Sequence, residues 1–502
     1  MDPRIARRVA LAGLACGVAA DILLDGVDPG LNVLVAVVAM FAVVTRFRPS
    51  GSRIDRFDLW LPPVGLLAAT AVALRSDPVV IWLDVTLAAC ALGAWAVAVT
   101  GRPVTRSSAS AVTALGASVL ASAGVGAMPV IPSAMSGAAA AEARDRLGRS
   151  APVLRGLALA VPAVLVFGVL LVSADPVFRH YVDVVLNLPI DLSDVSRRAG
   201  FVFVVGWLVA GLLAVAAARS PLIPPVAPTA VGTFEPVVPS DRPRRGATEA
   251  TVVLFAVELL FAMFVSLQFA YLFGGLDTLE AAGLTYSDYA RQGYFQLVAV
   301  VLLAGVLLAV VERRVGRGGR FVGAALGFVG LTVAILASAV LRLSLYLQAY
   351  GWTELRFYVA ASIVWLAFGA GLVIVLLLRD RMRWLVHGVA LSAIAITLGL
   401  SALGPQAFIA DRNLERVLDP RLIPPDGESG FDAAYLAAFS DDAVPLLVAA
   451  LERLEPVDRA VLLDALAARR TALESDPASR HWAAWNLSRE RARMALASLP
   501  AR

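Results

Sequence analysis

The chain has 502 residues, of which 59% are hydrophobic and 16% are charged. A soluble domain carries about 25% charged residues, so this composition excludes an ordinary soluble protein and favours a chain that lives in a bilayer. The formal net charge of +4 is small for the length, and the basic residues lie beside apolar runs. This arrangement is typical of membrane topology signals and not of nucleic-acid binding.

The basic residues are all arginine or histidine, because the sequence contains no lysine. Together with many Ala, Val, Leu and Gly residues, this usage is typical of a GC-rich, actinobacterium-like bacterial genome. The absence of lysine excludes Schiff-base chemistry and a P-loop. Both cysteines, Cys16 and Cys90, lie inside apolar runs, so we expect no disulfide and no thiolate metal site. We also expect no cofactor.

Apolar runs near bilayer-crossing length, which is about 20 residues, recur along most of the chain. We predict an all-α, polytopic transmembrane helical bundle of about eleven spans. The spans lie at Val9–Leu24, Leu31–Val44, Leu59–Leu74, Val79–Thr100, Val153–Ser173, Phe201–Ala218, Thr251–Phe273, Tyr294–Val311, Phe321–Leu347, Phe357–Leu378 and Leu385–Phe408.

Within this bundle, Ser107–Ala141 is long enough to cross, but Arg144 and Arg146 follow it. A crossing there would put those arginines, or every later cluster, outside, so we favour an interfacial or re-entrant helix. The sequence thus predicts six segments. They are a four-span membrane segment (1–106), an Ala-rich interfacial segment (107–152), a two-span hairpin (153–218), a Pro-rich cytoplasmic linker (219–247), a five-span membrane core (248–408) and a small extracytoplasmic helical tail (409–502).

The orientation follows from arginine in short loops, since cytoplasmic loops are enriched in basic residues. The loops between the arginine clusters are acidic or mixed. We therefore expect a multi-pass protein of the bacterial plasma membrane with its N-terminus in the cytoplasm and its C-terminus outside. The clusters lie at residues 4–8, 46–56, 102–106, 242–245, 313–320 and 379–383.

The tail is charged and has helical periodicity. Ser440 and Asp476-Pro477 carry the signals of helix starts. Trp482 and Trp485 either dock on the membrane surface or fill the core of the tail, and we expect the core. The predicted tail helices are Phe431–Phe439, Asp441–Leu454, Val457–Leu473 and Ala478–Leu499.

Ionisable residues deep in a span point to function, because inserting one at the centre of a helix needs about 2.5–3.5 kcal/mol. Glu258 lies inside the seventh run and Arg342 inside the ninth. Tyr346 and Tyr350 follow Arg342 at intervals of four, so the three share one face of a helix. Glu258 and Arg342 either belong to a relay or substrate path or form a structural ion pair, and the structural role is favoured.

A second group of polar and aromatic residues lies at the outer ends of the seventh to tenth runs. Such residues either form an interface belt or line a vestibule for a lipid head group or a small anion. The candidates are Gln268, Tyr271, Tyr286, Tyr289, Arg291, Tyr346, Tyr350, Glu354 and Arg356.

Four stretches together resemble a known family. They are Gln268–Gly275 with Thr285–Leu297, Ser173–Phe178, Arg342–Gly351 and Asp432–Pro445. In them the chain is similar to bacterial membrane proteins of the domain of unknown function 4173 family, which is related to 4153. The resemblance runs from about Leu154 to the C-terminus and leaves the first four spans generic. It implies a multi-pass membrane protein with an outward tail, and it implies no activity.

No motif in the sequence specifies a reaction. Our leading hypothesis is a non-enzymatic membrane bundle, transporter-like or envelope-associated, whose outer vestibule binds a lipid head group or a small anion and whose tail offers a surface to a protein partner. One alternative is a membrane transferase acting on lipid-linked substrates at the outer face, for which the loop holding Asp25 and Asp28 is short. The other is a membrane sensor with an outward helical tail.

Overall fold

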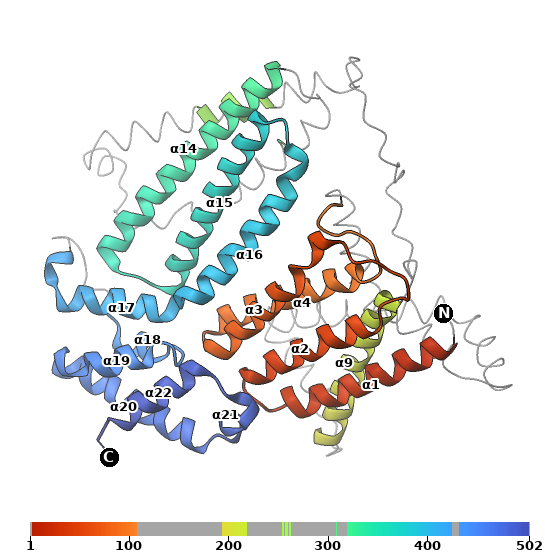
Figure 1. Ribbon diagram of the computed structural model, residues 1–502. Coiled ribbons are helices and arrows are strands. Elements are labelled where there is room, and N and C mark those ends of the chain that lie inside the picture. Colours follow the sequence, from red (N-terminus) through yellow and green to blue (C-terminus); the bar gives the residue numbers. More distant parts are fainter. Residues whose placement is uncertain are drawn as a thin grey trace, which may run out of the picture. The chain divides into compact units, whose positions relative to one another are not determined.

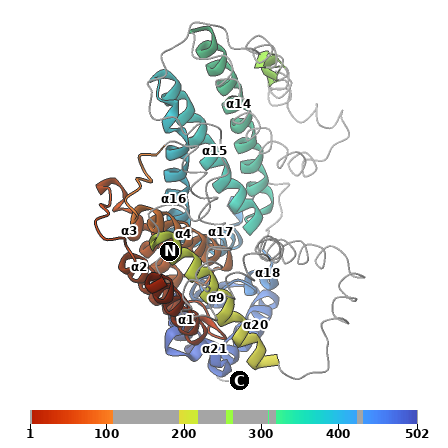
Figure 2. The same ribbon diagram turned by 90° about the vertical axis from the view of Figure 1, so that its right-hand side faces the viewer.

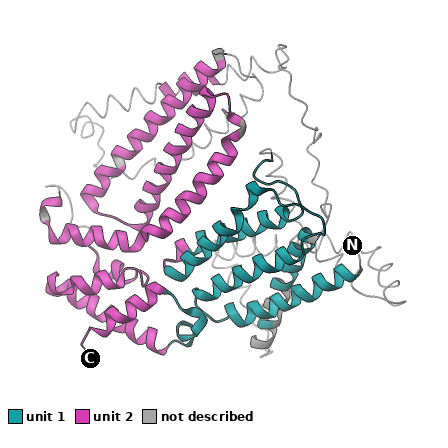
Figure 3. Cartoon of the chain, viewed as in Figure 1, with its two compact units in different colours: residues 1–74, 81–231, 476–486 teal, residues 75–80, 232–475, 487–502 magenta. Residues whose placement is uncertain are grey.

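The computed structural model of the chain describes residues 3–107, 193–217, 319–423 and 431–500, with residue 308 and several residues between 254 and 262. Every regular element in these ranges is a helix (Figure 1), so the all-α class is confirmed. The chain divides into two compact units (Figure 3). Unit 1 comprises Met1–Leu74, Ile81–Val231 and Asp476–Asn486, and unit 2 comprises Arg75–Val80, Gly232–Ser475 and Leu487–Arg502.

Unit 1 is a bundle of apolar helices. Close backbone packing joins its first and last long helices, since a Cβ atom on Gly13 would lie 2.7 Å from the carbonyl oxygen of Gly206. The small-xxx-small spacing of Gly13 and Gly17 therefore serves helix packing within the chain. The helices are α1 (Pro3–Leu24), α2 (Leu31–Arg46), the short η1 (Arg56–Asp58), α3 (Leu61–Leu74), α4 (Pro78–Ala98), which belongs to this unit from Ile81 onward, and α9 (Ser193–Ala217).

The arginine-rich loops of unit 1 meet at one end of its helices. The Asp58 carboxylate in η1 accepts hydrogen bonds from the backbone N–H groups of Val104 and Thr105, at 3.0 and 2.8 Å. The Ser52 hydroxyl donates to the carbonyl oxygen of Val99 at 2.8 Å. The linker between α2 and α3 is thereby fixed to the stretch after α4, which brings the clusters at 46–56 and 102–106 to the same end.

The turn between α1 and α2 lies at the other end of unit 1 and binds a short segment from the tail. The Leu31 N–H donates to the carbonyl of Trp485 at 2.9 Å, and the Asp28 N–H donates to that of Ala478 at 3.4 Å. The Asn486 side chain donates to the carbonyl of Val72, near the end of α3, at 2.8 Å. The arginine clusters at 46–56 and 102–106 and this tail segment therefore lie at opposite ends of the helices.

Unit 2 contains three long apolar helices, α14 (Gly319–Tyr350), α15 (Glu354–Leu378) and α16 (Leu385–Leu403), which lie side by side in both views (Figures 1 and 2). A short turn joins α14 to α15, and η2 (Met382–Trp384) precedes α16. The predicted run Leu385–Phe408 is divided, because Gly404 adopts a left-handed conformation with φ +70° and Pro405 begins a new helix, α17 (Pro405–Leu418). Glycine ends a helix in this way without the strain that a Cβ atom would add.

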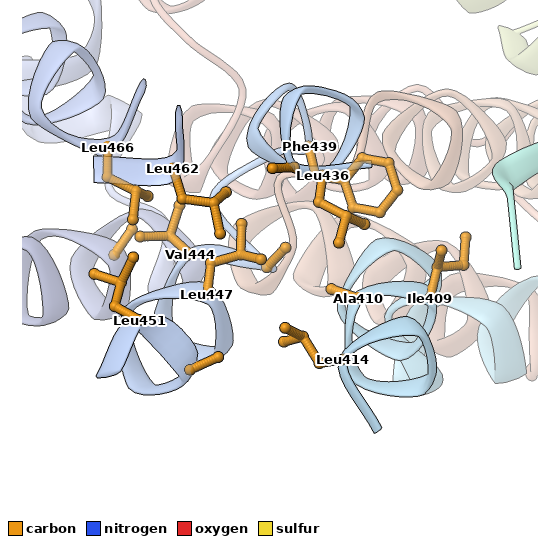
Figure 4. Packing of buried hydrophobic residues seen from close by; sticks show 14 of the residues in the cluster. Ile409, Ala410, Leu414, Leu436, Phe439, Val444, Leu447, Leu451, Leu462 and Leu466 are labelled. Atoms are coloured by element: carbon orange, nitrogen blue, oxygen red, sulfur yellow. The ribbon is translucent and has the colours of Figure 1, made fainter. Parts of the chain in front are cut away.

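One hydrophobic core holds the rest of unit 2 together (Figure 4). It joins Phe357 at the start of α15 and Ile409 of α17 to Leu436, Leu447 and Leu462 of the tail helices. The tail is thus packed on the ends of the apolar helices through a continuous core. Its elements in unit 2 are η3 (Pro420–Leu422), α18 (Ala433–Ala437), α19 (Val444–Ala450), η4 (Leu451–Arg453), α20 (Pro456–Ser475) and α22 (Leu487–Ala497).

The prediction of a single last tail helix, Ala478–Leu499, is wrong. This stretch is split into α21 (Pro477–Arg480), η5 (Trp482–Ala484) and α22. The start at Asp476-Pro477 is confirmed, since the Asp476 side chain accepts from the backbone of Ala478. The start at Ser440 is wrong, because α19 begins at Val444.

The expected core position of Trp482 and Trp485 is also wrong. Their side chains are 64% and 43% exposed. The alanines between them, Ala483 and Ala484, are fully buried instead. The small side chains face the protein because the backbone here packs tightly on the turn between α1 and α2.

Five helical segments in the described ranges are long and apolar enough to cross a membrane: Arg56–Leu74, Pro78–Ala98, Phe321–Tyr350, Glu354–Leu378 and Leu385–Leu403. They support a membrane protein, whereas the number of eleven spans stays a prediction. The predicted spans Val153–Ser173 and Tyr294–Val311, apart from residue 308, lie outside the described residues, as do Ser107–Ala141, apart from its first residue, and the linker 219–247.

Candidate functional site

Four of the candidate residues meet at the turn between α14 and α15. Gly351 ends α14 with φ +73°, and Thr353 caps α15 by accepting from the N–H of Arg356. The chain therefore reverses within a few residues and brings the aromatic end of α14 back against the polar start of α15. Rings of Tyr346 and Tyr350 lie 5.1 Å apart between centroids.

Two arginines cap the C-terminal end of α14. Arg356 donates from Nη1 to the carbonyl oxygens of Tyr350 and Gly351, at 2.9 and 2.6 Å. Arg416 of α17 donates to the carbonyl oxygens of Leu347 and Gln348, at 3.3 and 2.7 Å. The last carbonyls of a helix lack partners within the helix and carry partial negative charge, so cations stabilise this end.

The two arginines differ in their surroundings. Arg416 is buried, and burial together with the nearby charge of Arg356 lowers its pKa from the usual value. The guanidinium of Arg356 lies over the ring of Tyr346, 4.1 Å from its centroid. Among the described residues no acceptor contacts the Nη2 and Nε atoms of Arg356. These atoms form one edge of the planar group, and this edge can bind the oxygens of an anion.

A hydrogen-bonded chain connects the start of α15 to the tail. The Gln406 amide donates from Nε2 to Oε1 of Glu354 at 2.7 Å and accepts at Oε1 from the N–H of Ser440 at 2.6 Å. The N–H of Glu354 donates to the hydroxyl of Tyr435 at 2.9 Å. Asn413 fixes the turn by bonding both the N–H and the carbonyl of Trp352, each at 2.8 Å. The turn is therefore held in one conformation by side chains of α17 and α18.

Asp442 forms the centre of a second polar group. Its Oδ2 atom accepts from the backbone N–H groups of Ser76 and Asp77, at 2.8 and 3.0 Å. Its Oδ1 atom accepts from Arg75 at 3.5 Å and from the hydroxyl of Ser488. The carboxylate is fully buried and well satisfied, which is how a protein retains a buried charge.

Asp77 lies beside this group as the cap of α4. Its Oδ1 atom accepts from the N–H groups of Val79 and Val80, at 2.9 and 3.4 Å. Burial is the main cause that raises the pKa of Asp77 to about 6, and the charges of Glu354 and Asp442 add to it. The side chain therefore changes its protonation close to neutral pH.

Glu258 lies against α14. A Cβ atom on Gly327 would meet its Oε1 atom, so the glycine is what lets the carboxylate approach the helix. The neighbouring Phe261 stacks on Phe328 of α14, with centroids 5.0 Å apart. Glu258 is thus placed on a different part of α14 from the α14–α15 turn.

The remaining candidates Gln268, Tyr271, Tyr286, Tyr289 and Arg291 lie outside the described residues, as does the side chain of Arg342. Sequence reasoning missed the roles of several residues in unit 2. Asp77 carried a signal, because Asp before Pro is a typical helix cap, but the partners of the others are remote in the chain and no local pattern points to them. These residues are Asp77, Gln406, Asn413, Arg416 and Asp442.

The described ranges contain no group of three or more His, Cys, Asp or Glu side chains that could hold a metal ion.

A family model described as a domain of unknown function, DUF4153, matches residues 63–450. A comparison with curated proteins and a comparison with solved structures each gave no match. The match begins within α3, earlier than the resemblance that starts near Leu154. The family number 4173 is not confirmed, whereas its relative 4153 is.

Proposed function

Because the chain belongs to the family of the domain of unknown function DUF4153, which assigns no activity, we propose a function from the geometry. The protein is an integral membrane helical bundle, non-enzymatic and either transporter-like or envelope-associated. Its α14–α15 turn forms a vestibule at the outer face of the bacterial plasma membrane, and this vestibule binds an anionic phosphate group. The phosphate belongs to a lipid head group or to a small free anion.

The observation that carries this proposal is the fixed conformation of the Arg356 side chain. Its Nη1 atom is fixed by two carbonyl oxygens and its plane by the Tyr346 ring, so the side chain is held before a ligand arrives. The Nε and Nη2 edge has no acceptor among the described residues. Prior ordering lowers the entropy lost on binding, and this edge suits two oxygens of one phosphate.

The grouping of arginines supports an outward position for this turn. Arg379 and Arg381 follow the far end of α15, at the opposite end of that helix from Glu354. Under the positive-inside tendency the end with the arginines is cytoplasmic. The α14–α15 turn then faces outward, and we place the N-terminus inside and the C-terminus outside.

We propose that the vestibule is completed by the remaining sequence candidates from the preceding stretch of the chain, with Glu258 and Arg342 deeper along α14. These vestibule candidates are Gln268, Tyr271, Tyr286, Tyr289 and Arg291. We further propose that the tail binds a protein partner, and co-purification with the full chain tests this.

The test compares Arg356→Gln with wild type in detergent by native mass spectrometry, with phosphatidylglycerol and inorganic phosphate as separate probes. A charge-assisted hydrogen bond contributes about 1.5–3 kcal/mol, so we expect roughly 10–100-fold weaker binding of the preferred probe. Phosphatidylglycerol binding alone identifies a lipid head group, and binding of both probes identifies a free-anion site.

Two further variants separate binding from helix capping. Arg356→Lys keeps the charge and should retain part of the binding. Arg416→Gln removes the other cap of α14 but leaves Arg356 in place, so it should lower stability more than affinity. Equal affinity of wild type and Arg356→Gln for both probes would refute the anion site.

A further inference from the structure

We infer that the tail segment 476–486 is an anchor at the membrane–water interface, with Trp482 and Trp485 inserted among lipid head groups. The inference rests on the membrane assignment of the helices and is independent of the anion site. The segment belongs to unit 1, although it is far in the sequence from the helices that it contacts.

The segment 476–486 lies at one end of the helices of unit 1. Its backbone and side chains bond the turn between α1 and α2 and the carbonyl of Val72 close to the end of α3. Of these helices, α3 lies within the membrane-length segment Arg56–Leu74. A segment that sits at the end of a membrane-spanning helix lies at the level where hydrocarbon gives way to water.

The segment has a fixed conformation. Asp476 caps its first turn, with the N–H of Ala478 donating to Oδ1 at 3.0 Å. The N–H of Ala483 donates to Nδ1 of His481 at 3.3 Å. Gly30 approaches the carbonyl of Ala484 so closely that a Cβ atom would lie 2.7 Å from that oxygen. The exposed rings therefore project from a backbone that is bound on its other side.

The exposed side of the segment is aromatic and basic. Trp482 and Trp485 are large, exposed and separated by two fully buried alanines, so the segment has an apolar inner side and an aromatic outer side. Exposed Arg480 precedes them. Tryptophan prefers the head-group region, because its ring is apolar and its N–H still finds a hydrogen-bond partner there. An arginine beside it suits anionic lipid phosphates.

The bilayer fits this surface better than a protein partner does. The segment packs at the end of a helix of membrane-crossing length, so a bilayer around that helix would reach the segment. Other apolar side chains of α1, including Leu11, Leu14 and Ile22, are likewise exposed, as expected of a helix that faces lipid. Residues 476–486 thus lie at the membrane surface, although they belong to the tail.

The experiment uses the full chain in nanodiscs of phosphatidylcholine and phosphatidylglycerol. Tryptophan emission is recorded for wild type and for the double variant Trp482→Phe/Trp485→Phe, and the difference reports the two rings. Lipids with bromine near the head group or near the chain end quench according to depth, and iodide quenches from water. We expect the difference emission to be quenched at least twofold more by shallow bromine than by deep bromine, with little effect of iodide.

The control is Trp95→Phe, because Trp95 is buried within unit 1 and donates to Thr45 at 2.9 Å. Its difference emission should respond weakly to every quencher. If iodide quenched the Trp482/Trp485 emission while shallow bromine did not, the segment would lie in water and the inference would be wrong. Protection from all three quenchers would show that protein covers the rings, which also overturns it.

Discussion

Asp442 and Ser76, which are 366 residues apart in sequence, bond each other in both directions. The Ser76 N–H donates to Oδ2 of Asp442 at 2.8 Å, and the Asp442 N–H donates to the hydroxyl oxygen of Ser76 at 3.1 Å. Reciprocal bonds of this kind fix the relative position of two backbones and not only of two side chains. They hold the segment Arg75–Val80 to the turn that precedes α19, and both belong to unit 2.

Removing the Asp442 carboxylate should therefore destabilise the fold. Its side chain is fully buried and pairs with Arg75, whose side chain is 23% exposed. Loss of one partner from a buried pair costs about 3–5 kcal/mol. We expect Asp442→Ala to lower the free energy of unfolding by about this amount, measured by denaturant titration in detergent. Asp442→Asn should lose less, since it can still accept from the backbone, and exposed Glu452→Gln should change little.

The ionisation of Asp77 should make the stability of the folded protein depend on pH. Its pKa lies at about 6 in the folded protein, against about 3.9 in an unfolded chain. Between these two pH values the folded state binds more protons, so stability falls as pH rises from 4 to 6 and stays lower above it. The difference corresponds to roughly 3 kcal/mol.

Asp77→Asn keeps the helix cap, because asparagine caps as well as aspartate, but it cannot ionise. The variant should be more stable than wild type at pH 7 and nearly equal to it at pH 4, as measured by thermal unfolding across this range. Asp55, the partly exposed cap of η1, provides the control variant Asp55→Asn. Parallel pH profiles for wild type and Asp77→Asn would contradict the prediction.

Gly404 should tolerate a side chain poorly. It has a left-handed φ of +70°, and a Cβ atom would lie 2.8 Å from Nη1 of Arg75. We expect Gly404→Ala to cost about 1–3 kcal/mol from strain alone, and more from the clash. Gly26 has φ +67° with nothing within 4 Å, so Gly26→Ala shares the strain without the clash. Equal losses in the melting temperatures of both variants would rule out the contact with Arg75.

Leu447 tests the core between the tail and α15. It is 1% exposed and packs in the cluster that contains Phe357. Leu447→Ala should lower the free energy of unfolding by about 2–5 kcal/mol, and it should shift the unfolding of the apolar helices together with that of the tail. Val457, which is 75% exposed on α20, offers Val457→Ala as a control with almost no expected change. Separate melting of a weakened tail with unchanged apolar helices would contradict a shared core.

The amino-acid sequence alone is sufficient to predict the positions of the long helices. Predicted runs such as Phe321–Leu347 and Phe357–Leu378 match α14 and α15 within a few residues, because apolar length is a local property. The helix breaks at Gly404 and at Arg480–Leu487 were missed, since apolar and periodic patterns continue across them. Their cause is the tertiary packing of the turns.

The site was predictable only in part. Tyr346, Tyr350, Glu354 and Arg356 were found because helical spacing and short turns bring them together. The pairing of Arg416 with the end of α14 depends on the position of α17, which no local pattern contains. The expectation for Trp482 and Trp485 is wrong because hydrophobic residues in a helical pattern are expected to point inward, whereas here the alanines between them do so.

The most direct test of the membrane assignment and its orientation is a pair of reporter fusions after Arg502. Alkaline phosphatase folds only outside the cytoplasm, and green fluorescent protein exported in unfolded form stays dark there. We predict an active phosphatase fusion and a dark fluorescent fusion, both in the membrane fraction. A fluorescent fusion with inactive phosphatase would place the tail and the α14–α15 turn inside the cell and contradict the account.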